Sequence, residues 1–210
     1  MAFVVLYDAC VLYPAQVRDL LLRIATTGVV RARWSDAILD ECFRSILADR
    51  PDLDPEKLVR TRALMVRAVP DCLVTGYEHL IEGLDLPDPG DRHVLAAAIR
   101  AHAQALVTFN LKHFPDHVLA RYDMEAKHPD EFVLDALDLT PGTVVQCLTA
   151  QVSALRNPPV SVAELLDILR RAGLVQSVAR LRELLGSGTS EDLFSCPPRG
   201  AGQCAGWPAR

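Results

Sequence analysis

Short apolar runs alternate with amphipathic segments along the first half of the chain. Residues 3–7 form a continuous apolar run, which is typical of a strand buried on both faces. Apolar side chains then recur at helical spacing over 17–25. Shorter runs at 29–34 and 105–108 predict two further strands. Strands that alternate with helices indicate an α/β fold with a mostly parallel sheet.

Helix-capping residues predict where several helices begin and end. Ser35 can cap a helix that runs to about Asp49, and Asp54-Pro55 can open another that reaches about Val69. A brief strand is expected over 72–74 and a short helix over 77–82. From Asp91 onward the sequence is apolar nearly all round through Ile99, so we expect a buried helix there.

The pattern changes to successive helices after Pro129. Thr140-Pro141 opens one helix, and Ser161 to Glu164 forms a capping box that opens another, closed by Gly173. We therefore divide the chain into an α/β domain over 1–128 and a helical extension over 129–185. The segment 186–210 has no periodicity and is rich in Gly, Ser and Pro, which predicts disorder.

Composition narrows the class of protein. The 210 residues carry 22 Lys+Arg and 27 Asp+Glu, a net charge of −5, which argues against a non-specific nucleic-acid coat. No apolar run reaches the roughly 18 residues that a membrane span needs, and the N-terminus lacks a secretory pattern. The six cysteines contain no C-x-x-C pair. We expect a cytoplasmic protein that does not associate with membranes.

The candidate chemistry lies in Asp8, Glu41, Asp88 and Asp91, with Asn110 beside them. Asp8 and Asn110 directly follow predicted strands, and ligands of parallel sheets bind outside the carboxyl ends of the strands. Carboxylates crowded in such a place repel each other, and a divalent cation removes the repulsion. Mg²⁺ prefers oxygen ligands and keeps several waters, which leaves room for a phosphate oxygen.

Each of these residues also has a structural interpretation. An Asp after a strand or before Pro89 can form a turn, a Glu within a helix can be solvated, and Asp91 can stabilise a helix N-terminus. The Thr108 hydroxyl either supports the acids or is simply part of a β-branched strand residue. Arg92 and Lys112 could hold phosphates or be surface charges.

The local sequences around these acids resemble the PIN-domain nucleases, especially the VapC-type toxins. The resemblance covers about residues 3–125 and is carried by Val4–Asp8, Ser35–Glu41, Asp88–Ala98 and Val107–Pro115. It implies a three-layer α/β/α sandwich with a central, mostly parallel sheet, followed in this chain by C-terminal helices. It also implies cleavage of RNA with Mg²⁺ or Mn²⁺.

The resemblance implies Asp8, Glu41 and Asp91 as metal ligands and catalytic residues. Asn110 stands where the family commonly has a fourth acid, and its amide oxygen can still orient a metal-bound water. A subgroup has Asn there and an Asp three residues later, where this chain has His113. Pro115 argues against a helical zinc pair of His113 and His117.

Two hypotheses follow. In the first, the chain is an endoribonuclease that cleaves single-stranded RNA as the toxin of a toxin–antitoxin pair, with a cognate antitoxin as partner. In the second, the missing fourth acid has left a catalytically impaired PIN-like protein that binds an antitoxin or another helix. The extension over 129–185 could cover a groove, contact RNA or form a homodimer.

Overall fold

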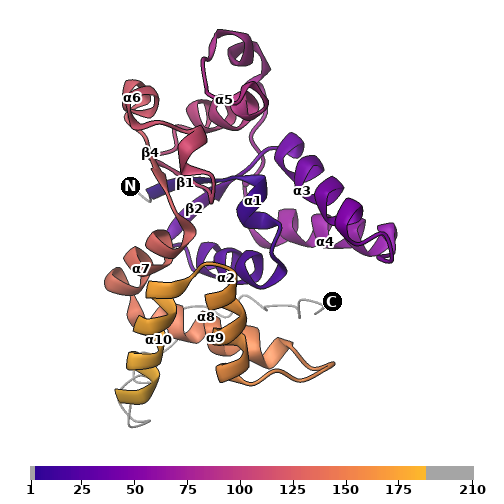
Figure 1. The fold of residues 1–210 in the computed structure, drawn as a ribbon, viewed down its shortest axis with the longest axis vertical. Coiled ribbons are helices and arrows are strands. Elements are labelled where there is room, and N and C mark those ends of the chain that lie inside the picture. Colours follow the sequence, from indigo (N-terminus) through magenta and orange to yellow (C-terminus); the bar gives the residue numbers. More distant parts are fainter. Residues whose placement is uncertain (1–2, 188–210) are drawn as a thin grey trace.

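The computed structural model describes residues 3–187, and within them a four-stranded parallel sheet forms the centre. Its strands are β1 (Phe3–Tyr7), β2 (Val30–Arg33), β3 (Ala105–Val107) and β4 (Glu125–Lys127), in the order β2-β1-β3-β4 (Figure 1). Every neighbouring pair is parallel. The predicted α/β class with a parallel sheet is therefore confirmed.

Hydrogen bonding continues past the ends of the central strands. The Asp8 amide donates to the Val107 carbonyl at 3.1 Å, and the Thr108 amide donates to the Lys127 carbonyl at 3.0 Å. Asp8 and Thr108 are consequently held side by side at the carboxyl edge of the sheet, where parallel α/β proteins place their ligands.

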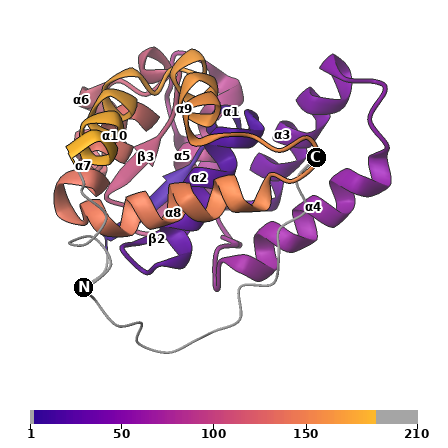
Figure 2. The same cartoon turned by 90° about the horizontal axis from the view of Figure 1, so that it is seen from below.

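Helices cover both faces of the sheet. Before the extension they are α1 (Ala9–Leu12), α2 (Ala15–Thr26), α3 (Asp36–Asp49), α4 (Pro55–Ala68), α5 (Arg92–Arg100) and α6 (Asp116–Leu119). The extension contains α7 (Pro129–Leu139), α8 (Pro141–Ala154), α9 (Val162–Arg171) and α10 (Val175–Ser187). In Figures 1 and 2, α5 lies on one side of the sheet and α2 lies on the other with α8 and α9. This is the expected three-layer arrangement.

The strongest capping signals are confirmed. The Ser35 side chain accepts the Ile38 amide where α3 begins, and the capping box of Ser161 and Glu164 is formed at the start of α9. Gly173 follows α9 with a φ of +104°. The sequence can predict these helix ends because each capping side chain bonds a backbone group only a few residues away.

Other predicted elements differ. The strand expected over 72–74 is a single bridge between Leu73 and Trp34, and the helix expected over 77–82 is a 3-10 helix (Glu78–Gly83). Helix α10 runs through Ser187 and so includes the first two residues, 186 and 187, of the segment predicted to be disordered. Residues 188–210 lie outside the part of the chain that the structure describes, as does the disorder expected there.

The C-terminal helices share one hydrophobic core with the sheet. Tyr7 of β1 stacks with Trp34 at a ring-centroid distance of 6.3 Å and meets Phe132 of α7 edge to face at 5.8 Å. Gln151 of α8 donates to the Gln16 carbonyl on α2 at 3.0 Å. Over residues 3–187, no helix has the length and apolar character that a bilayer crossing requires.

Candidate metal centre

Asp8 is a buried carboxylate held in a fixed orientation. It is 4% exposed and caps α1, where its Oδ1 accepts the Ala9 amide at 2.6 Å. Its Oδ2 accepts the Thr108 hydroxyl at 2.7 Å and the Cys10 thiol at 3.1 Å. Of the two interpretations of Thr108, the structure shows the one in which the hydroxyl supports an acid.

The surroundings of Asp8 disfavour its negative charge. Burial raises the pKa of the Asp8 carboxyl, hydrogen bonds from Cys10, Thr108 and Ala9 partly oppose that rise, and the charge of Glu41 raises the pKa further. A positive charge in the cleft would relieve both the desolvation and the repulsion.

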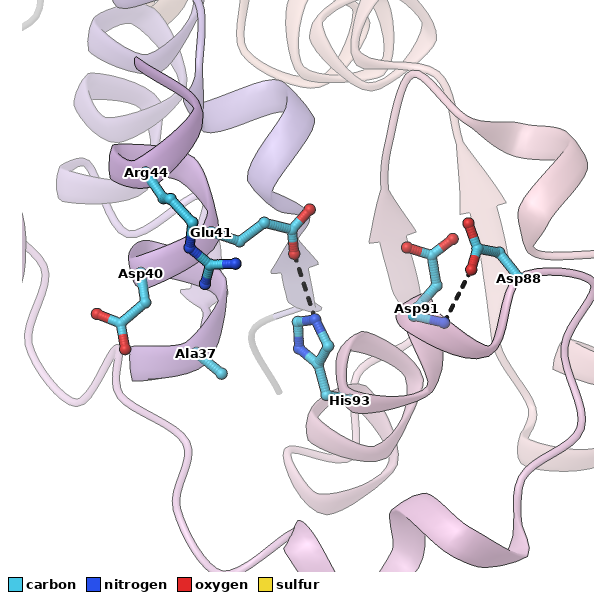
Figure 3. Close-up of a pocket in the computed structure, with 8 residues that line it drawn as sticks. Ala37, Asp40, Glu41, Arg44, Asp88, Asp91 and His93 are labelled. Atoms are coloured by element: carbon cyan, nitrogen blue, oxygen red, sulfur yellow. Dashed lines mark hydrogen bonds and ion pairs between the residues drawn. The ribbon is translucent and has the colours of Figure 1, made fainter. Parts of the chain in front are cut away.

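Glu41 reaches the same region from α3. Its side chain is 42% exposed, and its Oε2 lies 3.2 Å from Nε2 of His93, near the start of α5 (Figure 3). The contact joins two helices across the cleft. His93 therefore orients the carboxylate of Glu41, a role that the sequence did not indicate.

Asp88 and Asp91 belong to the turn that leads into α5. The Asp88 Oδ1 accepts the Gly90 amide at 2.8 Å and caps the 3-10 turn Pro89–Asp91. The Nδ1 atom of His113 lies 2.7 Å from Oδ2 of Asp91 and 3.9 Å from Oδ2 of Asp88. Asp88 therefore forms the turn that the sequence predicts and also belongs to the acidic site.

Asp91 also carries an unfavourable charge. Burial raises the pKa of its carboxyl first, the hydrogen bond with His113 lowers it, and the charges of Asp8 and Asp88 raise it again. Asp8 thus interacts electrostatically with both Glu41 and Asp91. Asp8 is therefore near enough to be influenced by, or to influence, two acids from distant parts of the sequence.

Within residues 3–187, the side chains whose ligand atoms lie close enough together to share a cation are not Asp8, Glu41 and Asp91. Ligand atoms of Asp88, Asp91 and His113 all lie within 4.8 Å of one another. Sequence reasoning missed His113 because its approach to Asp91 depends on the 3-10 turn Leu111–His113, which residue spacing does not reveal. The one available signal was that His113 stands three residues after Asn110, where a subgroup of the family has an acid.

A cleft of about 530 Å³ gives access to Glu41, Asp88 and Asp91, while the buried Asp8 is not among its lining residues. In Figure 3, Glu41 and Arg44 project from α3, and Asp91 and Asp88 lie across from them. The lining residues are Ala37, Asp40, Glu41, Arg44, Asp88, Gly90, Asp91 and His93. Arg44, which the sequence analysis did not single out, places a cation at the edge of an otherwise acidic cleft.

Asn110 lies at the same edge of the sheet. It is exposed, and its backbone N–H donates to the Thr108 hydroxyl oxygen at 2.9 Å. The Thr108 hydroxyl therefore joins the backbone of Asn110 to the carboxylate of Asp8. The catalytic role predicted for the Asn110 side chain remains a prediction.

Cys10 is the nucleophilic residue type nearest to Asp8. Burial, followed by the charge of Asp8, raises the pKa of its thiol to about 12. Because the thiolate is the reactive form, Cys10 is a protonated hydrogen-bond donor at neutral pH and not a nucleophile.

The donor set fits a divalent cation. Carboxylate oxygens dominate it, two of the acids have raised pKa values, and the cleft leaves space for water and a phosphate. Hard divalent ions such as Mg²⁺ and Mn²⁺ bind oxygen ligands of this kind.

Fold and site together define a parallel α/β protein with an acidic, cation-compatible cleft at the carboxyl edge of its sheet. The model of the PIN domain matches residues 4–112, just over half of the chain. The chain therefore belongs to the PIN-domain family, as the sequence motifs indicated. A second model, the VapC50 C-terminal domain, matches residues 129–183.

One curated relative is similar over much of this region. The chain is 43% identical over 114 residues to a Mycobacterium tuberculosis (strain ATCC 25618 / H37Rv) protein named "Putative ribonuclease VapC50". The matched part is 54% of this chain and 66% of the relative, so the chain spans about two thirds of the relative's length. No solved structure matches the chain.

Proposed function

We propose that this protein is a Mg²⁺- or Mn²⁺-dependent endoribonuclease that cleaves single-stranded RNA. The observation that carries the proposal is the buried, oriented Asp8 carboxylate at the carboxyl edge of the sheet, beside a cleft lined by Glu41 and Asp91. These residues come from the end of β1, from α3 and from the turn before α5. Crowding of acids around a buried carboxylate is costly, and a bound cation would offset that cost.

Each side chain has a separate task in this proposal. Asp8, Glu41 and Asp91 would hold the cation, with Asp8 oriented by Thr108 and Glu41 by His93. The cation, when bound, lowers the pKa of a water and neutralises charge on the leaving oxygen.

The remaining polar groups of the cleft would handle substrate. The planar guanidinium of Arg44 can pair with an RNA phosphate at the cleft edge. The Asn110 amide can orient the attacking water. Attack by water needs no protein nucleophile, which agrees with the protonated thiol of Cys10.

We propose further that the protein is the toxin of a toxin–antitoxin pair. Three findings support this assignment. The chain belongs to the PIN-domain family, its residues 129–183 match the VapC50 C-terminal domain, and its relative is named as a putative ribonuclease. The corresponding partners are an RNA substrate and a cognate antitoxin, and we propose that the protein acts in the cytoplasm.

Cleavage of single-stranded RNA by purified variants tests the proposed activity. With Mn²⁺ or Mg²⁺ the wild-type protein should cleave, and EDTA should stop it. D8N, E41Q and D91N should each lose at least about 100-fold in rate, because each removes a charge that holds the cation. D138N, an exposed substitution on α7, is the matched control and should retain the wild-type rate.

Two outcomes would contradict the proposal. Equal cleavage by wild type and D8N would assign the activity to a contaminant. Absence of cleavage together with absence of cation binding would instead favour the catalytically impaired PIN-like protein that the replaced fourth acid suggests.

A further inference from the structure

The imidazole of His113 lies among the acids at a position where it could be a ligand. Its Nδ1, and not a carbon edge, faces the carboxylates of Asp91 and Asp88, at 2.7 Å and 3.9 Å. The side chain of His113 is 24% exposed and that of Asp91 is 17% exposed, so the contact is largely shielded from solvent. Such shielding favours a fixed arrangement over a transient surface pair.

The two acids present the oxygen atoms that a cation would need. Asp88 uses Oδ1 to accept the Gly90 amide, which leaves Oδ2 directed toward His113. Ligand atoms about 2.1 Å from an ion and at right angles to each other lie about 3 Å apart. The separations of 2.7 Å and 3.9 Å lie on either side of that value, so small side-chain movements would allow all three groups to share one ion.

We propose that His113 is a direct nitrogen ligand, beside Asp91 and Asp88, for the cation of this centre, and that it shifts the preference of the centre from Mg²⁺ toward Mn²⁺. The inference rests on the proposed function, because it concerns the cation used there. Mg²⁺ strongly favours oxygen ligands, whereas imidazole suits the first-row transition metals. Replacing a carboxylate by an imidazole therefore changes which ion binds.

His93 is the competing imidazole in the cleft. It contacts one carboxylate, that of Glu41, at 3.2 Å, and it does not belong to the cluster of ligand atoms within 4.8 Å of one another. We therefore assign the nitrogen ligand to His113 and the orientation of Glu41 to His93.

Electron spin-echo envelope modulation of the Mn²⁺-loaded full chain tests the assignment, because it detects nitrogen bound directly to Mn²⁺. Wild-type protein should show this coupling, and ¹⁵N-histidine labelling should change its frequencies. The coupling should disappear in H113D and persist in H93Q and in H117Q, the control at an exposed residue of α6. Calorimetry with Mn²⁺ and Mg²⁺ should show the preference for Mn²⁺ falling about tenfold in H113D.

The possible failures can be told apart. Mn²⁺ binding and RNA cleavage without nitrogen coupling would overturn the inference and leave the proposed function intact. A coupling lost in H93Q would also overturn it, and this readout does not require H113D to fold. Failure of the wild-type chain to bind Mn²⁺ would overturn both the inference and the proposed function.

Discussion

Asp8 is a buried carboxylate whose negative charge is disfavoured by burial and by the charge of Glu41. Its hydrogen bonds from Thr108, Cys10 and Ala9 fix the direction of the carboxylate, while desolvation and Glu41 raise its pKa. An orientation maintained against an unfavourable charge is typical of a group that binds a cation. We therefore expect this charged carboxylate to destabilise the folded protein when no cation is bound.

Substitution of Asp8 by Asn should separate stability from activity. In EDTA at pH 7, D8N should melt about 2–4 °C above the wild type, because roughly 1 kcal/mol of charge burial and repulsion is removed. Addition of Mn²⁺ should raise the melting temperature of the wild type and leave that of D8N unchanged. Thermal denaturation followed by circular dichroism measures both effects.

The surface substitution D138N serves as the reference for this comparison and should melt within about 1 °C of the wild type. If D8N melts below the wild type in EDTA, the hydrogen bonds to the Asp8 carboxylate outweigh its unfavourable charge, and Asp8 does not destabilise the cation-free protein.

At the scale of elements, the corner between α9 and α10 packs against the loop that follows β3. A Cβ atom on Gly173 would lie 3.1 Å from Cε1 of Phe109, and the Phe109 ring meets His128 edge to face at 5.2 Å. Phe109 stands between Thr108 and Asn110, and its amide donates to the Cys10 sulfur at 3.2 Å. The C-terminal helices thus support the loop that carries two predicted site residues.

Gly173→Ala should therefore affect both folding and activity. Its φ of +104° strains any side chain, and the added methyl group would press on Phe109. We expect a loss of about 1–3 kcal/mol in the free energy of unfolding and slower RNA cleavage. Urea denaturation and the cleavage assay measure the two quantities.

Gly142→Ala on α8 is the matched control, because nothing lies within 4 Å of the added Cβ and its φ is not positive. It should leave both quantities near the wild-type values. If Gly173→Ala reduced stability but left the cleavage rate unchanged, the corner would be a structural contact without influence on the site.

A second inter-element contact fixes α10. The buried Asp130 carboxylate at the start of α7 accepts the amides of Gln176 and Ser177, each at 2.8 Å, and the Ser177 hydroxyl at 2.6 Å. Burial raises the pKa of Asp130, but these hydrogen bonds outweigh it and the net pKa is lowered. Asp130 therefore acts as an N-terminal cap supplied by another helix.

This cap predicts a pH-dependent contribution to stability. Because the folded-state pKa lies below the unfolded value of about 4, the contribution is complete above that pH and is lost as pH falls through the folded-state pKa. At pH 7, D130N should lose about 1–3 kcal/mol, and the difference from wild type should shrink toward pH 2–3. Urea denaturation at several pH values measures it, and a difference that does not depend on pH would contradict the cap.

For the whole molecule, the sequence predicted the elements whose signals are local. The helix from Asp36 to Asp49 was found from its Ser35 cap, and the strand Phe3–Tyr7 from its apolar run. The strand Glu125–Lys127 was missed because it is short and polar, and its partner β3 is distant in sequence. Its position becomes apparent only once the sheet has formed.

The site residues divide in the same way, into those that a local motif predicts and those whose contacts depend on the packed structure. Motif resemblance implies Asp8, Glu41 and Asp91 as metal ligands, which remains a prediction, and of these only Asp91 belongs to the cluster of ligand atoms within 4.8 Å of one another in the described residues. The contacts of His113 with Asp91 and of His93 with Glu41 depend on how a turn and a helix pack, which one sequence does not encode in its spacing. These histidines are the part of the site that required coordinates.

The charge of the whole chain gives the cation a further role. With a net charge of −5 and an acidic cleft, the protein should repel a polyanion such as RNA until positive charge is supplied. Arg44 provides one such charge at the cleft edge, and a bound divalent ion would provide more. Substrate binding and catalysis should consequently depend on the same ion.

Calorimetric titration of Mn²⁺ into the EDTA-stripped full chain tests the central claim most directly. Asp91 belongs both to the predicted trio and to the cluster with Asp88 and His113, so the D91N variant is the decisive comparison. We predict saturable binding to the wild type and at least about tenfold weaker binding to D91N. Absence of binding to the wild type, or equal binding to both, would contradict the assignment of this cleft as a metal centre.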